Sequence, residues 1–117
     1  MSDCLFCTIA AGGIPADIVL ETDTVLAFRD ISPRARVHVL VVPRAHHETA
    51  AAMAAADPAG LAEVMVAAGR VAELEGIDQT GYRLVSNAGP DSGQEVPHLH
   101  VHVLGGQKLG VVGPGAD

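Results

Sequence analysis

Residues 93–106 read GQEVPHLHVHVLGG, and in this stretch His98, His100 and His102 alternate with apolar residues. In an extended strand, alternate side chains point to the same face. We therefore expect the three imidazoles to share one face and the apolar residues to pack on the other. A helix would instead place the first and last histidine one turn apart. The β-branched residues and the flanking proline and glycine favour the strand, which we predict over residues 96–104.

The spacing of these histidines limits what they can hold. At about 3.3 Å per residue, neighbouring histidines stand roughly 6.6 Å apart and the outer two roughly 13 Å apart. One phosphate or one metal ion cannot contact all three, but two adjacent rings can hold a phosphoryl group between them. A neutral imidazole is a competent nucleophile when an acceptor holds its far nitrogen protonated. An ordinary strand face is the weaker interpretation, because each half-buried imidazole needs a partner.

The rest of the chain predicts an α+β fold. Short apolar runs and turn residues indicate a helix over 4–11, a β-hairpin over 18–28, a central strand over 37–42, one or two helical turns over 50–56, a long helix over 57–76 and a strand over 82–86. Asp57 is placed to begin the long helix and Gly76 to end it. We expect a mainly antiparallel five-stranded sheet with one long helix and a short N-terminal helix. One domain should cover 1–106, followed by a glycine-rich tail over 107–117.

The composition excludes several classes of protein. With 117 residues the chain is the length of one domain, and 49% of its residues are hydrophobic, so disorder is excluded. The net charge of −7 argues against binding to nucleic acid or to an anionic membrane surface. No apolar run is long enough to span a membrane, and no signal peptide is visible. We expect a cytoplasmic protein with reduced thiols.

Cys4 and Cys7 have the spacing of metal ligands. A redox pair or two core cysteines explain the pair equally well. A structural zinc site needs two more ligands, which histidines without another role could supply. His38, by contrast, lies inside the predicted central strand and is interpreted as a buried core histidine.

The motif HLHVHVL, preceded by Gly-Gln-x-Val, resembles the signature of the histidine triad (HIT) family. The segments AFRDISP (27–33), HVLVVPRAH (38–46) and YRLVSN (82–87) also resemble that family. The resemblance covers roughly residues 4–106, nearly the whole chain. The glycine pair after the motif is similar to the Hint branch, whereas the Fhit branch more often has Pro-Arg there.

The resemblance implies a HIT-like fold and hydrolysis at the α-phosphate of a purine nucleotide. Hint-like enzymes cleave adenosine phosphoramidates and aminoacyl adenylates. By the same resemblance, His100 would attack phosphorus, His102 would hydrogen-bond the phosphate and leaving group, and the carbonyl near His98 would orient His100. The implied binding residues are Asp30 for the ribose, Asn87 and Gln94 for the phosphate, and Leu5, Phe6, Ile9, Phe28 and Ile31 for the purine.

The resemblance also implies a metal site and a dimer. Some bacterial members pair such cysteines with two histidines around zinc, which here would be Cys4, Cys7, His46 and His98, with His47 as the rival of His46. The zinc would be structural, and the chemistry would need no cofactor. The helix over 57–76 and the strand over 82–86 are the candidate elements of a homodimer interface. Glu95 departs from the Ser or Thr common in Hint-like sequences, and a carboxylate there could favour a substrate that carries an ammonium group.

Other interpretations stay open. From the residues alone, Asp30 could simply begin a turn, Asn87 could begin a loop, and Phe6 and Phe28 could be core residues. Two further functions are possible besides the phosphoramidase: a zinc-stabilised nucleotide-binding module with incidental turnover, and a dinucleoside polyphosphate hydrolase like the Fhit branch.

Overall fold

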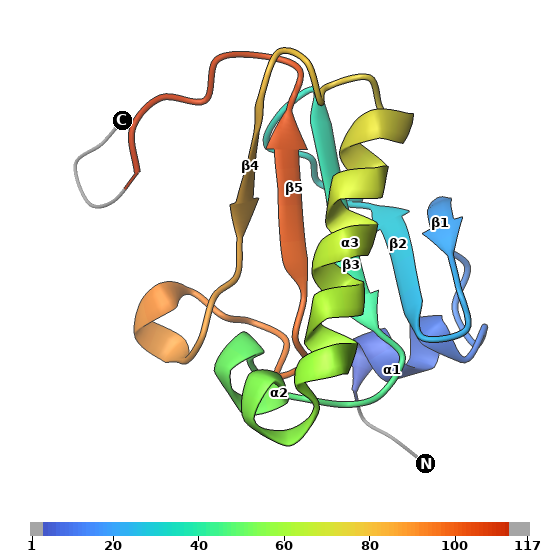
Figure 1. Cartoon of the computed structure of the whole chain (residues 1–117). Coiled ribbons are helices and arrows are strands. Elements are labelled where there is room, and N and C mark those ends of the chain that lie inside the picture. Colours follow the sequence, from blue (N-terminus) through green and yellow to red (C-terminus); the bar gives the residue numbers. More distant parts are fainter. Residues whose placement is uncertain (1–3, 113–117) are drawn as a thin grey trace.

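A five-stranded antiparallel sheet organises the computed structural model, which describes residues 4–112 (Figure 1). Along the chain its elements are α1 (Leu5–Ala10), β1 (Ile18–Glu21), β2 (Val25–Arg29), β3 (Val37–Pro43), α2 (Ala50–Ala56), α3 (Pro58–Leu74), β4 (Tyr82–Val85), the short 3₁₀ turn η1 (Pro90–Ser92) and β5 (Val101–Gly105). The strands lie in the order β1-β2-β3-β5-β4, and every neighbouring pair is antiparallel. This confirms the predicted α+β fold.

The alternation of side chains along the strands gives the sheet two different faces. Val39 and Val41 of β3, with Val101 and Val103 of β5, belong to the large core cluster that α3 covers. In Figure 1, α3 crosses this face of the sheet. The even-numbered residues of β3 point the other way and pack in a smaller cluster with Phe6 of α1. The near-continuous burial of β3 therefore reflects packing on both faces, as its apolar sequence predicts.

The long helix begins and ends where its sequence indicates. Asp57 is the N-cap of α3, and its carboxylate accepts a hydrogen bond from the backbone N–H of Gly60 at 3.0 Å. Pro58 occupies the first helical position, where a missing N–H costs nothing. Gly76 has a φ of +74°, so the chain leaves the helix through a backbone conformation that favours glycine. The helical turns expected over 50–56 form the separate helix α2, capped by Thr49.

The strand predicted over 96–104 is wrong in its first half, because β5 begins at Val101. The last residue pair between β3 and β5 joins Val41 to Val101, so residues 96–100 lie beyond the pairing. The proline in this segment has no N–H to donate to a sheet, and the backbone N–H of Leu99 instead donates to the carbonyl of His47 at 2.6 Å. The segment still runs close to the end of β3.

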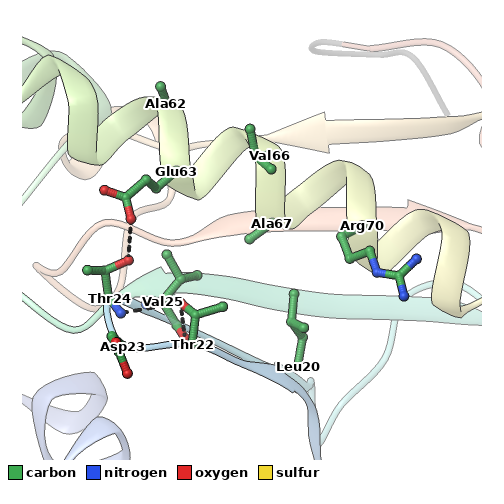
Figure 2. Close-up of a pocket in the computed structure, with 10 residues that line it drawn as sticks. All are labelled: Leu20, Thr22, Asp23, Thr24, Val25, Ala62, Glu63, Val66, Ala67 and Arg70. Carbon is green, nitrogen blue, oxygen red and sulfur yellow. Dashed lines mark hydrogen bonds between the residues drawn. The ribbon is translucent and has the colours of Figure 1, made fainter.

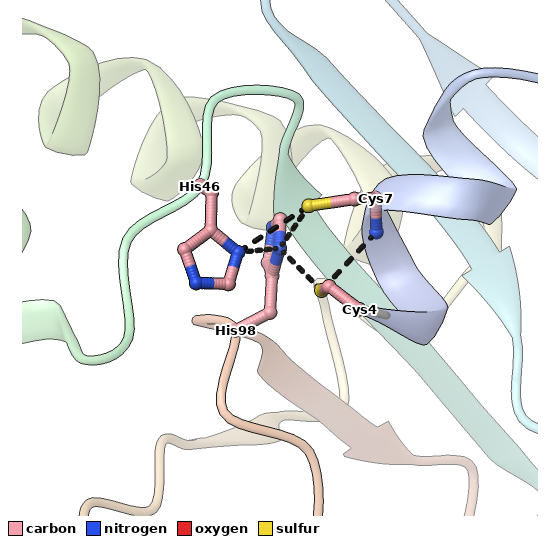
Figure 3. Close-up of side chains that lie close together, drawn as sticks. All are labelled: Cys4, Cys7, His46 and His98. Carbon is pink, nitrogen blue, oxygen red and sulfur yellow. Dashed lines mark hydrogen bonds between the residues drawn. The ribbon is translucent and has the colours of Figure 1, made fainter. Parts of the chain in front are cut away.

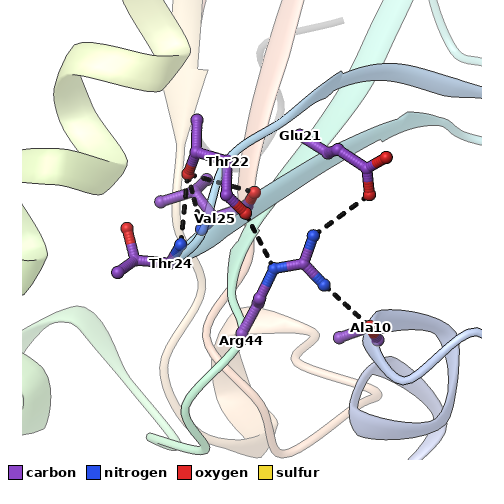
Figure 4. Close-up of polar contacts among 6 residues, drawn as sticks. All are labelled: Ala10, Glu21, Thr22, Thr24, Val25 and Arg44. Atoms are coloured by element: carbon purple, nitrogen blue, oxygen red, sulfur yellow. Dashed lines mark hydrogen bonds and ion pairs between the residues drawn. The ribbon is translucent and has the colours of Figure 1, made fainter.

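Arg44 attaches α1 to the sheet (Figure 4). Its guanidinium donates to the carbonyl of Ala10 at 2.8 Å and to that of Thr22 at 2.9 Å, and pairs with Glu21 at 3.1 Å. One side chain thus fixes the end of α1 against the β1–β2 turn. Because α1 carries Phe6 and Cys7 and has Cys4 as its N-cap, Arg44 helps to position the candidate site described below.

The described part of the chain holds no helix that is both long enough and apolar enough to cross a bilayer. Within the predicted tail, residues 107–112 form neither helix nor strand, and residues 113–117 lie outside the described part.

Candidate active site and adjoining metal centre

His100 is held by the backbone two residues before it. Its ring is buried, with 8% of the residue exposed, and its Nδ1 lies 2.7 Å from the carbonyl oxygen of His98. Because a carbonyl can only accept, His100 must donate the Nδ1 proton in this bond. In the neutral form of the ring, this bond leaves the lone pair on Nε2, the arrangement that a nucleophilic imidazole needs.

Phe6 supports the histidines from α1. Its ring meets that of His100 edge to face, with the centroids 4.8 Å apart, and that of His98 at 6.0 Å. It also packs against Phe28 of β2 at 5.7 Å. Both phenylalanines are buried in the smaller core cluster. The histidines therefore lie on the face opposite α3, which agrees with the face predicted from the alternation.

His102, in β5, is half-buried and close to two other imidazoles. Its ring centroid lies 5.0 Å from that of His100, and its Nδ1 lies 2.9 Å from Nε2 of His38. Burial, together with the like charges that His100 and His38 would carry, lowers the pKa of His102 to about 4. The ring is therefore neutral near pH 7 and can act there as a hydrogen-bond donor.

The structure adds His38 to the site, which sequence reasoning assigned to the core. It is buried, with 5% exposed, but it contacts His102 and lies 3.5 Å from Asp30. Burial lowers the pKa of His38, and the nearby Asp30 carboxylate opposes that effect. Residue 38 shares the parity of the three histidines, but this becomes informative only with the register of β3 against β5, which puts His38 and His102 on one face.

Asp30 has two contacts, one with each carboxylate oxygen. One oxygen accepts a hydrogen bond from the backbone N–H of Ser32 at 2.7 Å, which closes a turn directly after β2. The other faces His38. The residue is half-buried, so both the turn role and a role toward a ligand are compatible with its position.

The other residues predicted to bind the nucleotide differ in their hydrogen bonds and in their exposure. The side-chain amide of Gln94 accepts from the N–H of Gly89 and donates to the carbonyl of Glu48, both at 2.8 Å, and so fastens the loop after β4. Asn87 is half-buried, whereas Glu95 is exposed. Within the predicted purine set, Phe6 and Phe28 are buried, Ile9 packs against them, Leu5 is 46% exposed and Ile31 is 99% exposed.

Four side chains from three distant segments lie close together, and one of them is His98 of the triad (Figure 3). Nδ1 of His98 lies 3.2 Å from the sulfur of Cys4 and 3.4 Å from that of Cys7. Nδ1 of His46 lies 3.3 Å from the sulfur of Cys7 and 3.2 Å from Nδ1 of His98. His46 rather than His47 is the second histidine of this group.

The donor atoms fit a tetrahedral metal ion. With bond lengths of about 2.0 Å to nitrogen and 2.3 Å to sulfur, two tetrahedral zinc ligands lie about 3.3 Å apart when both are nitrogen and about 3.5 Å apart when one is sulfur. The four contacts given above span 3.2–3.4 Å. His98 donates its Nε2 proton to the carbonyl of Pro43 at 2.8 Å, which leaves Nδ1 unprotonated toward the cysteines. Burial lowers the pKa of His98, so the ring stays neutral, as a ligand must be.

A separate groove of about 590 Å³ lies between the β1–β2 hairpin and α3 (Figure 2). Thr24 donates across one end of it to Glu63 at 2.6 Å. Its lining includes Val25 and Ala67, which belong to the core cluster on the α3 face, and none of the histidines lines it. The groove is therefore on the other side of the sheet from the triad.

Comparison with known proteins agrees with this arrangement. Residues 11–109 match the HIT domain. The chain belongs to the HIT family. As a HIT protein it is 43% identical to the purine nucleoside phosphoramidase of Escherichia coli K12 over 106 residues, which cover 91% of this chain and 89% of the relative. Its fold matches a histidine triad protein from Clostridium difficile with a TM-score of 0.90, at 42% identity over 97% of this chain and 98% of the other. A HIT family hydrolase from Legionella pneumophila gives a TM-score of 0.87, at 45% identity over 91% and 95% of the two chains.

Proposed function

We propose that this HIT-family enzyme is a purine nucleoside phosphoramidase that hydrolyses the bond between the α-phosphorus and an amine, with His100 as the nucleophile. The observation that carries the proposal is the 2.7 Å hydrogen bond from Nδ1 of His100 to the carbonyl of His98. It reserves the Nε2 lone pair for attack on phosphorus. The similarity to the E. coli phosphoramidase supports the same substrate class, and aminoacyl adenylates present the same α-phosphate.

In the first step, Nε2 of His100 forms a bond to the α-phosphorus as the phosphorus–nitrogen bond breaks. The departing nitrogen keeps the electron pair of that bond and takes up a proton from solvent, so it leaves as an amine. In the second step, water attacks phosphorus, the bond to Nε2 breaks and a proton returns to solvent. The products are the nucleoside monophosphate and the amine, and His100 is restored.

We infer that neighbouring groups support this reaction. His102, neutral at pH 7, donates a hydrogen bond to the phosphate or the leaving group. The oxygen of Asp30 that does not close the turn accepts from the ribose hydroxyls. Asn87 and Gln94 border the phosphate, and the exposed carboxylate of Glu95 favours a substrate that carries an ammonium group. The proposed purine pocket is formed by apolar side chains, of which Leu5 and Ile31 are exposed: Leu5, Phe6, Ile9, Phe28 and Ile31.

Zinc would hold the N-terminal segment in place. Cys4, Cys7, His46 and His98 supply two sulfur and two nitrogen donors and leave no position open for substrate, so the proposed role is structural. When bound, the ion cross-links α1 to the segments that follow β3 and precede β5. The chemistry itself needs only the side chains described above.

A homodimer is the proposed assembly. Among residues 4–112, strand β4 forms one edge of the sheet and pairs with β5 alone, so its other edge can pair with another chain. Apolar side chains are exposed on α3 and on β4 itself, with Met65 at 44% and Tyr82 at 40%. Sedimentation equilibrium should give twice the chain mass, and Tyr82→Asp, in β4, should shift the protein toward the monomer. A monomeric wild-type protein would refute this assembly.

A His100→Ala variant tests the function. It should lose at least about 10³-fold in the cleavage of an adenosine phosphoramidate, because no nucleophile remains, while it still binds AMP. His47→Gln, a histidine outside both clusters, is the matched control. Retained turnover in the His100 variant would exclude the mechanism. Faster hydrolysis of diadenosine polyphosphates by the wild type would favour the Fhit-like alternative, and AMP binding without turnover would favour a binding module.

Elemental analysis tests the metal site. The purified protein should contain about one zinc ion per chain, and Cys7→Ser should lower the zinc content and the melting temperature together. Thr8→Ser, on the same helix, should change neither. Zinc that stays at wild-type content in the Cys7 variant would contradict the ligand set.

A further inference from the structure

The protonation of His38 follows from its backbone partner. Nδ1 of His38 lies 3.1 Å from the backbone nitrogen of Arg34, whose N–H points to it. A backbone N–H can only donate, so Nδ1 must accept and carries no proton. The ring is buried and neutral, which places its single proton on Nε2.

That proton determines the state of His102. Nε2 of His38 lies 2.9 Å from Nδ1 of His102 and 3.5 Å from the nearer oxygen of Asp30. The first distance is that of a good hydrogen bond, whereas the second is too long for a strong one. Nδ1 of His102 therefore accepts, and the neutral ring of His102 must carry its own proton on Nε2.

A metal ion is the competing explanation for Asp30, His38 and His102, since their donor atoms also lie within 4.8 Å of one another. The two clusters differ in their protons. In the cysteine cluster, His98 gives its proton to the carbonyl of Pro43 and turns a lone pair to the sulfur atoms. His38 does the opposite: its backbone partner is a donor, so the nitrogen that faces the cluster is protonated. A metal ion could bind Nε2 of His38 only if the ring lost its single proton and became an imidazolate. A chain of hydrogen bonds is therefore favoured over a metal site.

We propose that His38 is a positioning residue that fixes the tautomer of His102, so that His102 presents a permanent Nε2–H donor to the phosphate or the leaving group. The chain of donors runs from the N–H of Arg34 through His38 to His102 and moves no proton. The catalytic consequence rests on the proposed function, but the tautomer itself is a property of the free protein. His102 accordingly acts through a hydrogen bond that is set before substrate arrives, which saves the cost of reorienting it during the reaction.

Nitrogen-15 NMR of protein labelled at histidine tests the tautomer directly. Wild-type His102, assigned by comparison with His102→Gln, should show a protonated Nε2 and an unprotonated Nδ1 at pH 7.5. In His38→Leu, which keeps an apolar side chain at the buried position, the two nitrogens should approach the averaged shifts of exchanging tautomers. His38→Gln can place an amide N–H near the position of Nε2, so it should restore much of the wild-type pattern.

Kinetics provide the second readout. His38→Leu should lower kcat for an adenosine phosphoramidate by about 10- to 100-fold while it changes the affinity for AMP much less, because a donor is lost and the pocket is not. His38→Gln should recover most of kcat. If wild-type His102 carries its proton on Nδ1, or if the Leu variant keeps the wild-type tautomer, the proposal is wrong. It is also wrong if added Zn²⁺ shifts the His38 and His102 signals of protein whose cysteine cluster is already filled.

The two proposals fail in different ways. An inactive wild-type protein with a fixed Nε2–H tautomer would refute the phosphoramidase and leave the role of His38 in place. An active protein in which both His38 variants keep full kcat would refute the catalytic part of the role of His38 and leave the phosphoramidase in place.

Discussion

His98 joins the two clusters through different atoms. Its ring nitrogen faces Cys4 and Cys7, whereas its carbonyl oxygen accepts the proton of His100. The ring is fully buried, and its second nitrogen bonds to the carbonyl of Pro43. A residue held at three points moves little, so the carbonyl that orients the proposed nucleophile is held by the candidate metal site.

Phe6 offers a test at the scale of one residue. Truncation to alanine should lower the free energy of unfolding by about 3–5 kcal/mol, because the ring is buried between Phe28 and His100. Urea unfolding with zinc present measures the change. Ile31→Ala is the matched control: it removes an apolar side chain that is 99% exposed, so its effect should stay within about 0.5 kcal/mol. Similar losses in both variants would show that Phe6 is not a core residue.

The sequence indicated the faces of single residues better than their partners. Alternation predicted a common face for the triad, and spacing marked Cys4 and Cys7 as possible ligands. It could not show that His38 contacts His102, because that contact joins residues 64 apart along the chain. A histidine in an apolar strand is compatible with a core and with a site, and only the register of β3 against β5 distinguishes the two.

At the scale of elements, α1 is a short helix whose position depends on its attachments. It has six residues, so its own hydrogen bonds stabilise it little. Phe6 holds it from within the core, and Arg44 holds its end through the carbonyl of Ala10. Cys7 in the helix and its N-cap Cys4 both face the candidate metal site (Figure 3). The placement of α1 therefore links the metal site to the sheet.

Arg44→Met tests this attachment. Methionine keeps an apolar stem but donates no hydrogen bonds, so we expect a loss of about 1–3 kcal/mol in stability and faster amide exchange over residues 5–11. Hydrogen exchange followed by mass spectrometry measures it. Arg70→Met, which removes an exposed arginine from α3, is the control. Unchanged exchange in the N-terminal segment of the Arg44 variant would contradict the proposed attachment.

The elements were predicted well where local signals were strong. The capping residues Asp57 and Gly76 and the apolar run of β3 correctly indicated α3 and the central strand. The start of β5 was missed because apolar alternation continues from Leu99 into the strand, while the pairing of β5 with β3 ends at Val101, opposite Val41. Pairing depends on the partner strand, which the local pattern does not contain.

At the scale of the whole molecule, the sheet separates two environments. One face packs against α3 and is entirely apolar at its centre, whereas the other carries imidazoles among apolar side chains. The antiparallel topology was predictable because strands follow one another with few helices between them. The contact of Cys4 and Cys7 with His46 and His98 joins residues that are far apart along the chain, so local patterns could not predict it. Only the family resemblance implied it.

The burial of His102 on the face that carries the imidazoles makes the stability of the protein depend on pH. The pKa of His102 is about 4 in the folded protein and about 6.5 in an unfolded chain. Between these values the unfolded chain binds a proton that the folded chain does not, so the free energy of unfolding falls as pH falls from 6.5 toward 4. Above pH 6.5 this effect is absent.

Urea unfolding at pH 7.5 and pH 5 measures the effect. The wild-type protein should lose more stability between these values than His102→Gln, which has no group to protonate at that position. The difference between the two losses isolates His102 from the other histidines. Equal losses would mean that burial does not depress the pKa of His102.

The two attachments of residue 98 also constrain how sequences of this fold can diverge. Every amino acid supplies a main-chain carbonyl. A related protein without the metal site can therefore have another side chain at position 98 and still orient His100 through that carbonyl. No such freedom exists at position 100, where the ring itself would form the bond to phosphorus. Of the three histidines, His98 is thus the one whose side chain can change during evolution, together with the loss of Cys4 and Cys7.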